Sequence, residues 1–202
     1  MGIIGIVSAL TLPNLNSSTG EKEKVAKLKK IYQNLDDAYG RATSVYGPID
    51  EWFVNDSTDV AQVTRFGDRL TEFMKVSKTT INSGGYKTFI LADGQSVHVS
   101  YVTSNGTSSN SYPGLNWYGT IDIDIDGPNK GKNIDGHDQF KFSITNQGIL
   151  PEDTSTQLGD KPAKKYDNGD GYYATAWVIM NENMDYLKCF DDLNWNTKTS
   201  CK

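Results

Sequence analysis

The opening segment of the chain is the feature that most constrains its fold. From Gly2 to Leu12 the sequence carries no charge and no strongly polar side chain, and Pro13 then predicts a kink. Eleven helical residues rise only about 16 Å, roughly half of a bilayer core. The segment therefore suits an apolar stem, the start of a buried helix, or a signal-peptide core ending at Val7-Ser8-Ala9 without its basic leader.

An amphipathic helix is predicted after this segment. Charge begins at Glu21, and Gly47-Pro48 is a strong stop signal. Apolar residues recur every three or four positions, as on one face of a helix: Val25, Leu28, Ile31, Tyr32, Leu35, Ala38, Tyr39, Ala42 and Val45. Lysines lie off or beside this face, at Lys24, Lys27, Lys29 and Lys30. They form either a basic collar suited to a membrane surface or an ordinary solvated face.

The rest of the chain predicts a mixed head. A second helix is expected from Thr58 to Val76, with Trp52 and Phe53 packed beneath the first helix, and Asp93-Gly94 predicts a hairpin turn. Strands are expected at residues 86–91, 96–102, 117–125, 140–144, 173–180 and 184–187, and loops at 103–113 and 151–171. We therefore predict an α+β fold, in which a long N-terminal helix packs on an antiparallel sheet.

The segment from Thr120 to Asn129 contains the pattern Asp-x-Asp-x-Asp-Gly. Three alternating carboxylates followed by glycine are typical of the start of an EF-hand calcium loop. Asn133 stands in place of the bidentate glutamate and Pro128 replaces a usual ligand, so a true EF-hand is not expected. The alternation of isoleucine and aspartate also fits a half-buried strand with its aspartates in water.

An oxygen-rich loop after this strand is the candidate metal site. Calcium takes six to eight oxygen ligands, which carboxylate and amide side chains supply. The candidate ligands are Asp126, Asn129, Asn133, Asp135 and Asp138. A second acidic turn, at residues 167–171, is expected to be a plain turn.

Composition limits the other functions. The net charge of −5 argues against a nucleic-acid partner. Only two histidines are available as a catalytic base, His98 and His137, and His98 is expected on the outer side of a strand. A hydrolase could use Asp122 and Asp124, which would lie about 7 Å apart on one strand face, but no motif supports it. A binding module could instead use exposed aromatic side chains, of which the candidates are Tyr112, Trp117, Tyr118 and Trp195.

The N-terminal segment resembles a known family. The run Gly2-Ile-Ile-Gly-Ile-Val-Ser-Ala-Leu-Thr-Leu-Pro13 is similar to the later part of the N-terminal helix of type IV pilins and type II secretion pseudopilins. That helix carries a glycine and a proline at the separation of Gly5 and Pro13. The amphipathic helix leading into a β-rich head is also similar to the family, as are short segments at residues 91–94, 126–131 and 176–189.

The resemblance implies a non-enzymatic subunit of a pilus-like or pseudopilus-like filament. Residues 1–20 would be a truncated hydrophobic stem, because the family's leader, cleavage site and glutamate lie upstream of the matching part. Residues 21–47 would pack on the head, which comprises residues 48–202. The assembly residues would be Ile3, Ile4, Gly5, Ile6, Val7, Leu10, Leu12 and Pro13.

The implied partners are other pilin-like subunits, the membrane and the secretion or pilus assembly machinery. The implied location is the inner membrane before assembly and the bacterial cell surface or an extracellular filament afterwards. Some pseudopilin heads hold calcium, which agrees with the calcium interpretation of the acidic loop.

The only two cysteines, Cys189 and Cys201, lie close together near the C-terminus. A bridge would close a short loop and would imply an oxidising compartment. Closeness in sequence and the absence of a competing cysteine favour the pairing over two unrelated thiols. Pilins commonly end in a similar disulfide-closed loop.

Overall fold

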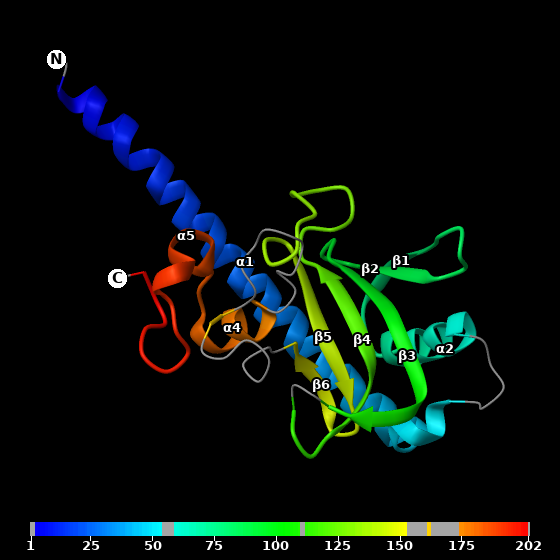
Figure 1. The fold of residues 1–202 in the computed structure, drawn as a ribbon. Helices are drawn as coiled ribbons and strands as arrows, with labels where there is room; N and C mark the ends of the chain where they lie inside the picture. The colour runs from blue at the N-terminus through cyan, green and yellow to red at the C-terminus, as the bar shows by residue number, and fades with distance from the viewer. Residues whose placement is uncertain (1–2, 54–58, 110–111, 153–160, 163–173, 202) are drawn as a thin grey trace.

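The structure is a computed structural model that describes residues 3–53, 59–109, 112–152, 161–162 and 174–201. For residues 3–19 it describes the helical backbone only. The long helix α1 spans Ile3–Tyr46, and Figure 1 shows it running along the sheet and continuing past it toward its N-terminal end. Gly47 follows the helix with φ 79°, a left-handed conformation that commonly terminates helices and that glycine adopts without strain.

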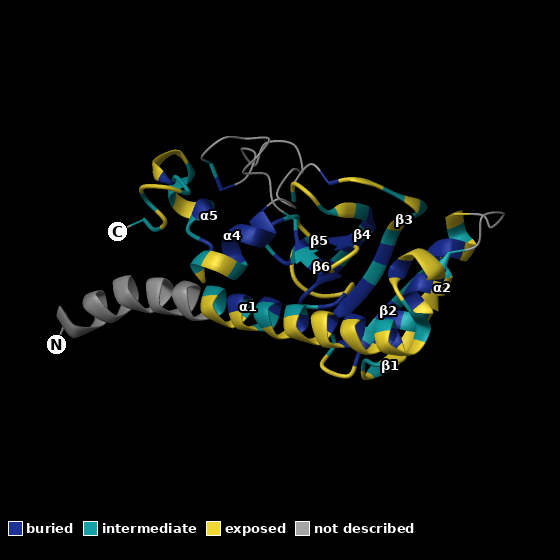
Figure 2. Ribbon diagram, turned by 90° about the horizontal axis from the view of Figure 1, so that it is seen from below, coloured by how far each residue is buried: buried dark blue, intermediate teal, exposed yellow. Residues whose placement is uncertain are grey.

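The apolar face predicted for α1 packs against the head. Seven of its nine residues are buried, Tyr32 is half-buried, and Val45 at the end of the helix is exposed. Figure 2 shows the buried residues on one side of the helix, facing the sheet. This part of the prediction is confirmed, and its physical basis is the burial of one helix face per turn.

In the described residues, six antiparallel strands follow one another in chain order across one sheet. The strands are β1 Val76–Ile81, β2 Lys87–Leu91, β3 Ser96–Ser108, β4 Asn116–Asp124, β5 Gln139–Thr145 and β6 Gly148–Pro151. Four of them lie where strands are predicted, whereas β1 and β6 are additional. The segment 103–113, predicted as a loop, is partly wrong because β3 continues to Ser108.

The two faces of the sheet differ in chemistry. Cross-strand pairs such as Val97 with Ile123 and Ile123 with Phe140 are buried on the face that packs against α1, where Tyr32 stacks on Phe142 with ring centroids 5.5 Å apart. Side chains alternate along a strand, so the intervening residues belong to the opposite face. We call this the polar face, and it comprises Ser96, His98, Asp122, Asp124, Gln139 and Lys141.

Two short helical elements cover the end of α1. The 3-10 helix η1 spans Ile49–Trp52, and α2 spans Asp59–Thr71. Trp52 packs under α1 as predicted, with its ring centroid 5.8 Å from that of Tyr39. The predicted end of α2 at Val76 is wrong, because the chain turns after Thr71 and Val76 starts β1.

The C-terminal strands predicted at residues 173–180 and 184–187 are wrong. Helix α4 spans Ala174–Asn181, helix α5 spans Tyr186–Cys189, and the 3-10 helix η4 spans Phe190–Asp192. The predicted strand was based on a short apolar run, and such a run fits a buried helix equally well. The helix is favoured here because Ala174 to Val178 are all buried between α1 and the sheet edge.

Candidate functional site

The predicted assembly residues lie on the first turns of α1. Ile3, Ile4, Gly5, Ile6, Val7, Leu10, Leu12 and Pro13 all belong to the helical backbone, and their side chains lie outside the described part of the structure. Within that described part, no helix combines the length and the apolar character needed to cross a bilayer.

Next to this segment, α1 is fastened to the loop that carries the candidate calcium ligands. We call residues 126–138 the acidic loop. The Lys27 ammonium donates a hydrogen bond to Asp126 Oδ1 at 3.1 Å, and Lys24 Nζ donates to the backbone oxygen of His137 at 2.9 Å. The two lysines are one turn apart on the helix, so together they hold both ends of the loop against α1.

Further ion pairs join α1 to other parts of the head. They are Lys29 with Glu182, Lys30 with Asp93 at 2.9 Å, and Glu21 with Lys188. All four lysines predicted as a basic collar therefore contact oxygen atoms of the head. Their charges serve to attach the helix to loops that lie far away in the sequence, an alternative that sequence analysis did not consider.

We expect Lys27→Met to lower the free energy of unfolding by about 1 kcal/mol, the upper range for a partly exposed ion pair. The reason is that Lys27 also pairs with Glu23, so that the substitution removes two contacts. Chemical denaturation measures the change. Lys22→Met, at an exposed lysine of the same helix, is the matched control and should change the value by less than about 0.5 kcal/mol. Equal losses in the two variants would contradict this assignment.

Asp138 organises the acidic loop from inside. It is fully buried, and its carboxylate accepts hydrogen bonds from the backbone N–H groups of Lys132 at 2.5 Å, Asn133 at 3.1 Å and Ile134 at 2.7 Å. Gly131, with φ 69°, lies so close to this carboxylate that a Cβ atom there would clash with it. The carboxylate of Asp138, a predicted calcium ligand, thus binds the backbone of its own loop.

Asp124 performs a similar role at the end of β4. Its Oδ1 accepts the backbone N–H groups of Asp126 at 3.0 Å and of Gly127 at 2.8 Å. Burial raises the pKa of Asp124, because it disfavours the charged form, although the two N–H donors act in the opposite direction. Within the acidic loop, burial lowers the pKa of His137, and the positive charges of Lys132 and Lys24 lower it further.

Two of the five candidate calcium ligands lie close together, because a Cβ atom on Gly131 would be within 3.0 Å of both Asp138 Oδ2 and Asp126 Oδ2. Asn129 and Asn133 are exposed, and Asp135 is half-buried and forms a bridge with Gln139. In the described ranges, no three histidine, cysteine, aspartate or glutamate side chains are grouped so that they could hold a metal ion. The calcium loop therefore stays a prediction from the sequence.

The residues predicted for a hydrolase and for a binding module lie in different parts of the head. Asp122 and Asp124 share the polar face, as the strand alternation predicts, and Lys141 Nζ lies 3.7 Å from Asp122 Oδ1. Of the four aromatic candidates, Tyr118 is buried, Trp195 packs edge-on against Trp177, and the Tyr112 hydroxyl donates to the Pro151 carbonyl. Trp117 stacks on Tyr101, which is 45% exposed. Tyr101 is not among the aromatic residues that the sequence analysis named.

The C-terminal disulfide is present between Cys189 and Cys201. The backbone N–H of Cys201 donates to Asp185 Oδ2 at 2.8 Å, and Asn183 Nδ2 donates to the carbonyl of Thr199 at 2.9 Å. Lys188 of α5 pairs with Glu21 of α1, and Figure 1 shows α5 near the point where α1 leaves the head. The disulfide therefore closes the part of the head next to the predicted stem.

Replacing both cysteines with alanine should lower the free energy of unfolding by about 3 kcal/mol, because the bridge restricts a loop of this length in the unfolded chain. Thermal unfolding of the double variant measures the loss. Adding a reductant to the unaltered chain should give a similar decrease, whereas it should not affect the variant. No difference between the oxidised and reduced chains would contradict the expected role.

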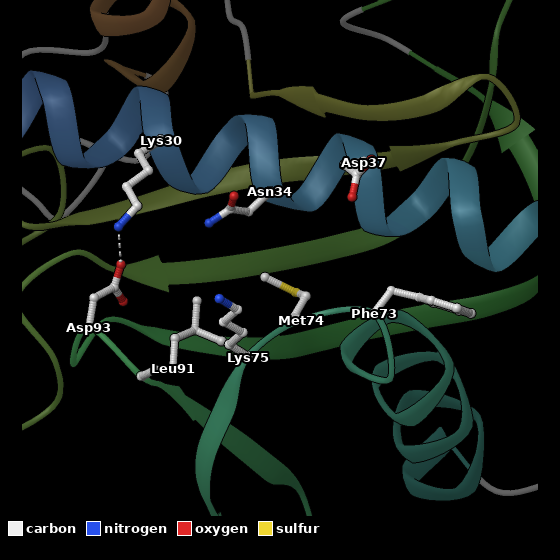
Figure 3. A pocket seen from close by; sticks show the side chains of 9 residues that line it. Lys30, Asn34, Asp37, Phe73, Met74, Lys75, Leu91 and Asp93 are labelled. Atoms are coloured by element: carbon white, nitrogen blue, oxygen red, sulfur yellow. Dashed lines mark hydrogen bonds and ion pairs between the residues drawn. The ribbon is translucent and has the colours of Figure 1, made fainter.

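A small cavity of about 320 Å³ lies between α1, the α2–β1 connection and the β2–β3 turn. Figure 3 shows the Lys30–Asp93 ion pair at one end and Met74 and Leu91 among its lining residues. Lysine and aspartate side chains line it together, so the cavity presents no single charge that would select a ligand.

The comparisons with known proteins identify no relative: no family model, no curated protein and no solved structure matches the chain.

Proposed function

We propose that the chain is a non-enzymatic structural subunit of a filament that resembles a type IV pilus or a type II secretion pseudopilus. One observation carries the proposal. Helix α1 has 44 residues, and among those whose side chains the structure describes, Glu21 and Val25 are the first that contact the head. The turns before these contacts carry the uncharged sequence from Gly2 to Leu12. An apolar helix of this kind is stable only when another surface buries it, such as copies of itself or lipid.

The contacts of α1 also support a role for this helix in fixing the position of the head relative to the stem. The ion pairs of Lys24, Lys27, Lys29 and Lys30 and the apolar face fix the helix relative to the head. If the stems of neighbouring copies pack together, the heads are then placed at defined positions around the filament. The partners would be further pilin-like subunits, the membrane before assembly and the assembly machinery, and the head would be displayed at the cell surface.

A second candidate function is supported by the stacked pair of exposed Tyr101 and half-buried Trp117. The two rings are stacked with centroids 5.7 Å apart and an interplanar angle of 15°. Stacked aromatic rings at a surface can bind flat or apolar faces of ligands, which suits a secreted binding module. Loss of ligand binding in Tyr101→Ala, without loss of self-association, would favour this second function.

The filament proposal is tested by placing charges in the predicted stem. A double variant, Ile6→Asp with Leu10→Asp, should reduce self-association and binding to lipid vesicles by about ten-fold or more, because each apolar side chain contributes about 1.5–3 kcal/mol when buried. Sedimentation velocity and vesicle co-flotation measure the two effects. The melting temperature of the head should stay unchanged.

Val45→Asp is the matched control. Val45 is an exposed apolar residue on the same helix but lies at its other end. Charge placed there should leave self-association and vesicle binding unchanged. If both variants behave like the unaltered chain, the stem does not mediate assembly and the proposal is wrong.

A further inference from the structure

A cavity of about 420 Å³ opens on the polar face of the sheet. Strands β3, β4 and β5 contribute its walls, and the acidic loop folds over one side. The lining includes Ser96, His98, Asp122, Asp124, Asn133 and Gln139. The register explains this grouping, because His98 and Ser96 on β3 pair with Asp122 and Asp124 on β4, and Gln139 on β5 pairs with Asp124.

Two carboxylate oxygens of this cavity lack a hydrogen-bond donor among the described residues. Asp124 is only 7% exposed, and its Oδ2 has no donor although its Oδ1 accepts two backbone N–H groups. Asp122 Oδ1 is also buried without a donor, and Lys141 Nζ at 3.7 Å is too far away for a hydrogen bond. Buried carboxylate oxygens that lack donors are costly, so a group that supplied N–H donors here would be stabilising.

The acceptor atoms limit which donor group would fit here. A guanidinium binds best when both oxygens of one carboxylate are available, and Asp124 Oδ1 is already occupied by the backbone. A primary ammonium has three separate N–H donors that can reach acceptors on different residues. We propose that this cavity binds a primary ammonium group, with Asp122 and Asp124 as its charged acceptors. The proposal goes beyond the filament function and does not depend on it.

Titration with n-butylamine at neutral pH tests the proposal, with the backbone amide signals of Ser96 and Gln139 observed by NMR. Saturable shifts of these two signals are expected. Tetramethylammonium carries the same charge without N–H donors and should bind at least about ten-fold more weakly, which corresponds to the loss of a charged hydrogen bond. This comparison uses the unaltered chain and does not depend on the folding of a variant.

Asp122→Asn should weaken n-butylamine binding by about ten-fold or more, because it removes a charged acceptor and leaves the backbone contacts of Asp124 intact. Asp37→Asn makes the same charge change on the exposed surface of α1 and should alter binding by less than about two-fold. Equal affinity for tetramethylammonium, no effect of Asp122→Asn, or displacement of n-butylamine by calcium chloride would overturn the proposal.

The same titration with an N-acetylated peptide that contains one lysine distinguishes two sources of the ammonium group. Binding comparable to that of n-butylamine would assign the cavity to a lysine side chain of another protein. Binding of n-butylamine alone would assign it to a small free amine. Both results agree with the proposed chemistry of the site.

Discussion

We expect Asp138→Ala to lower the free energy of unfolding by about 4 kcal/mol, since removing a buried charge with several hydrogen bonds leaves its partners unsatisfied. Asp138 is 0% exposed, and three backbone N–H groups of the acidic loop donate to it. Alanine offers no acceptor. Gly131 packs tightly against the Asp138 carboxylate, so removing the carboxylate leaves a space that the loop must close. Chemical denaturation measures the loss.

Two further variants make this expectation specific. Asp138→Asn retains one oxygen acceptor and should be less destabilising than alanine, although it loses the charge. Asp37→Ala removes an exposed aspartate of α1 and should change the free energy of unfolding by less than about 0.5 kcal/mol. A loss for Asp138→Ala that is no larger than the loss for Asp37→Ala would contradict the structural role of this carboxylate.

Trp52→Ala should be similarly severe, with a loss of about 4 kcal/mol, which is typical of a fully buried tryptophan. Trp52 is 0% exposed and lies between α1 and α2, with ring centroids 5.8 Å from Tyr39 and 5.4 Å from Phe66. Its indole N–H donates to the carbonyl of Gly47 at 2.9 Å, which also fixes the chain where it leaves α1. The substitution should therefore weaken the attachment of the long helix to the head.

Trp52→Phe is the conservative comparison. It keeps an aromatic ring in the core but removes the N–H donor and part of the volume, so its loss should be about half that of alanine. Urea denaturation of the three proteins gives the ranking. If phenylalanine and alanine destabilise equally, the hydrogen bond to Gly47 matters more than the packing, and the ranking proposed here is wrong.

The fold was predictable where one pattern dominated locally. The apolar spacing from Val25 to Ala42 predicted the buried face of α1, and alternation predicted β4 with buried isoleucines. The strand predicted at residues 173–180 was wrong, because the period of the short apolar run at 174–178 does not separate a strand from a buried helix. Strand β1 at the sheet edge was not predicted. All but one of its residues are exposed, so its sequence carries no apolar alternation.

The site was less predictable because its contacts join distant residues. Lys27 and Asp126 are 99 positions apart, so no local pattern could pair them. Asp124 was expected in water by alternation, but the chain folds back after β4 and buries it. The oxygen-rich composition of the acidic loop predicts a metal site, and it does not reveal that the Asp138 carboxylate accepts three N–H groups of the loop itself. Composition shows that acceptors are present but not which donors they find.

Photo-cross-linking from the stem tests the filament proposal most directly. A benzophenone amino acid in place of Val7 should link one copy to another, and peptide mapping should place the links within residues 3–13 of the second copy. The same group in place of Gln33, an exposed position of α1 beside the head, should give few links between copies. Links from position 7 that form only within one chain, to residues of its own head, would contradict the proposal that this segment assembles with other copies.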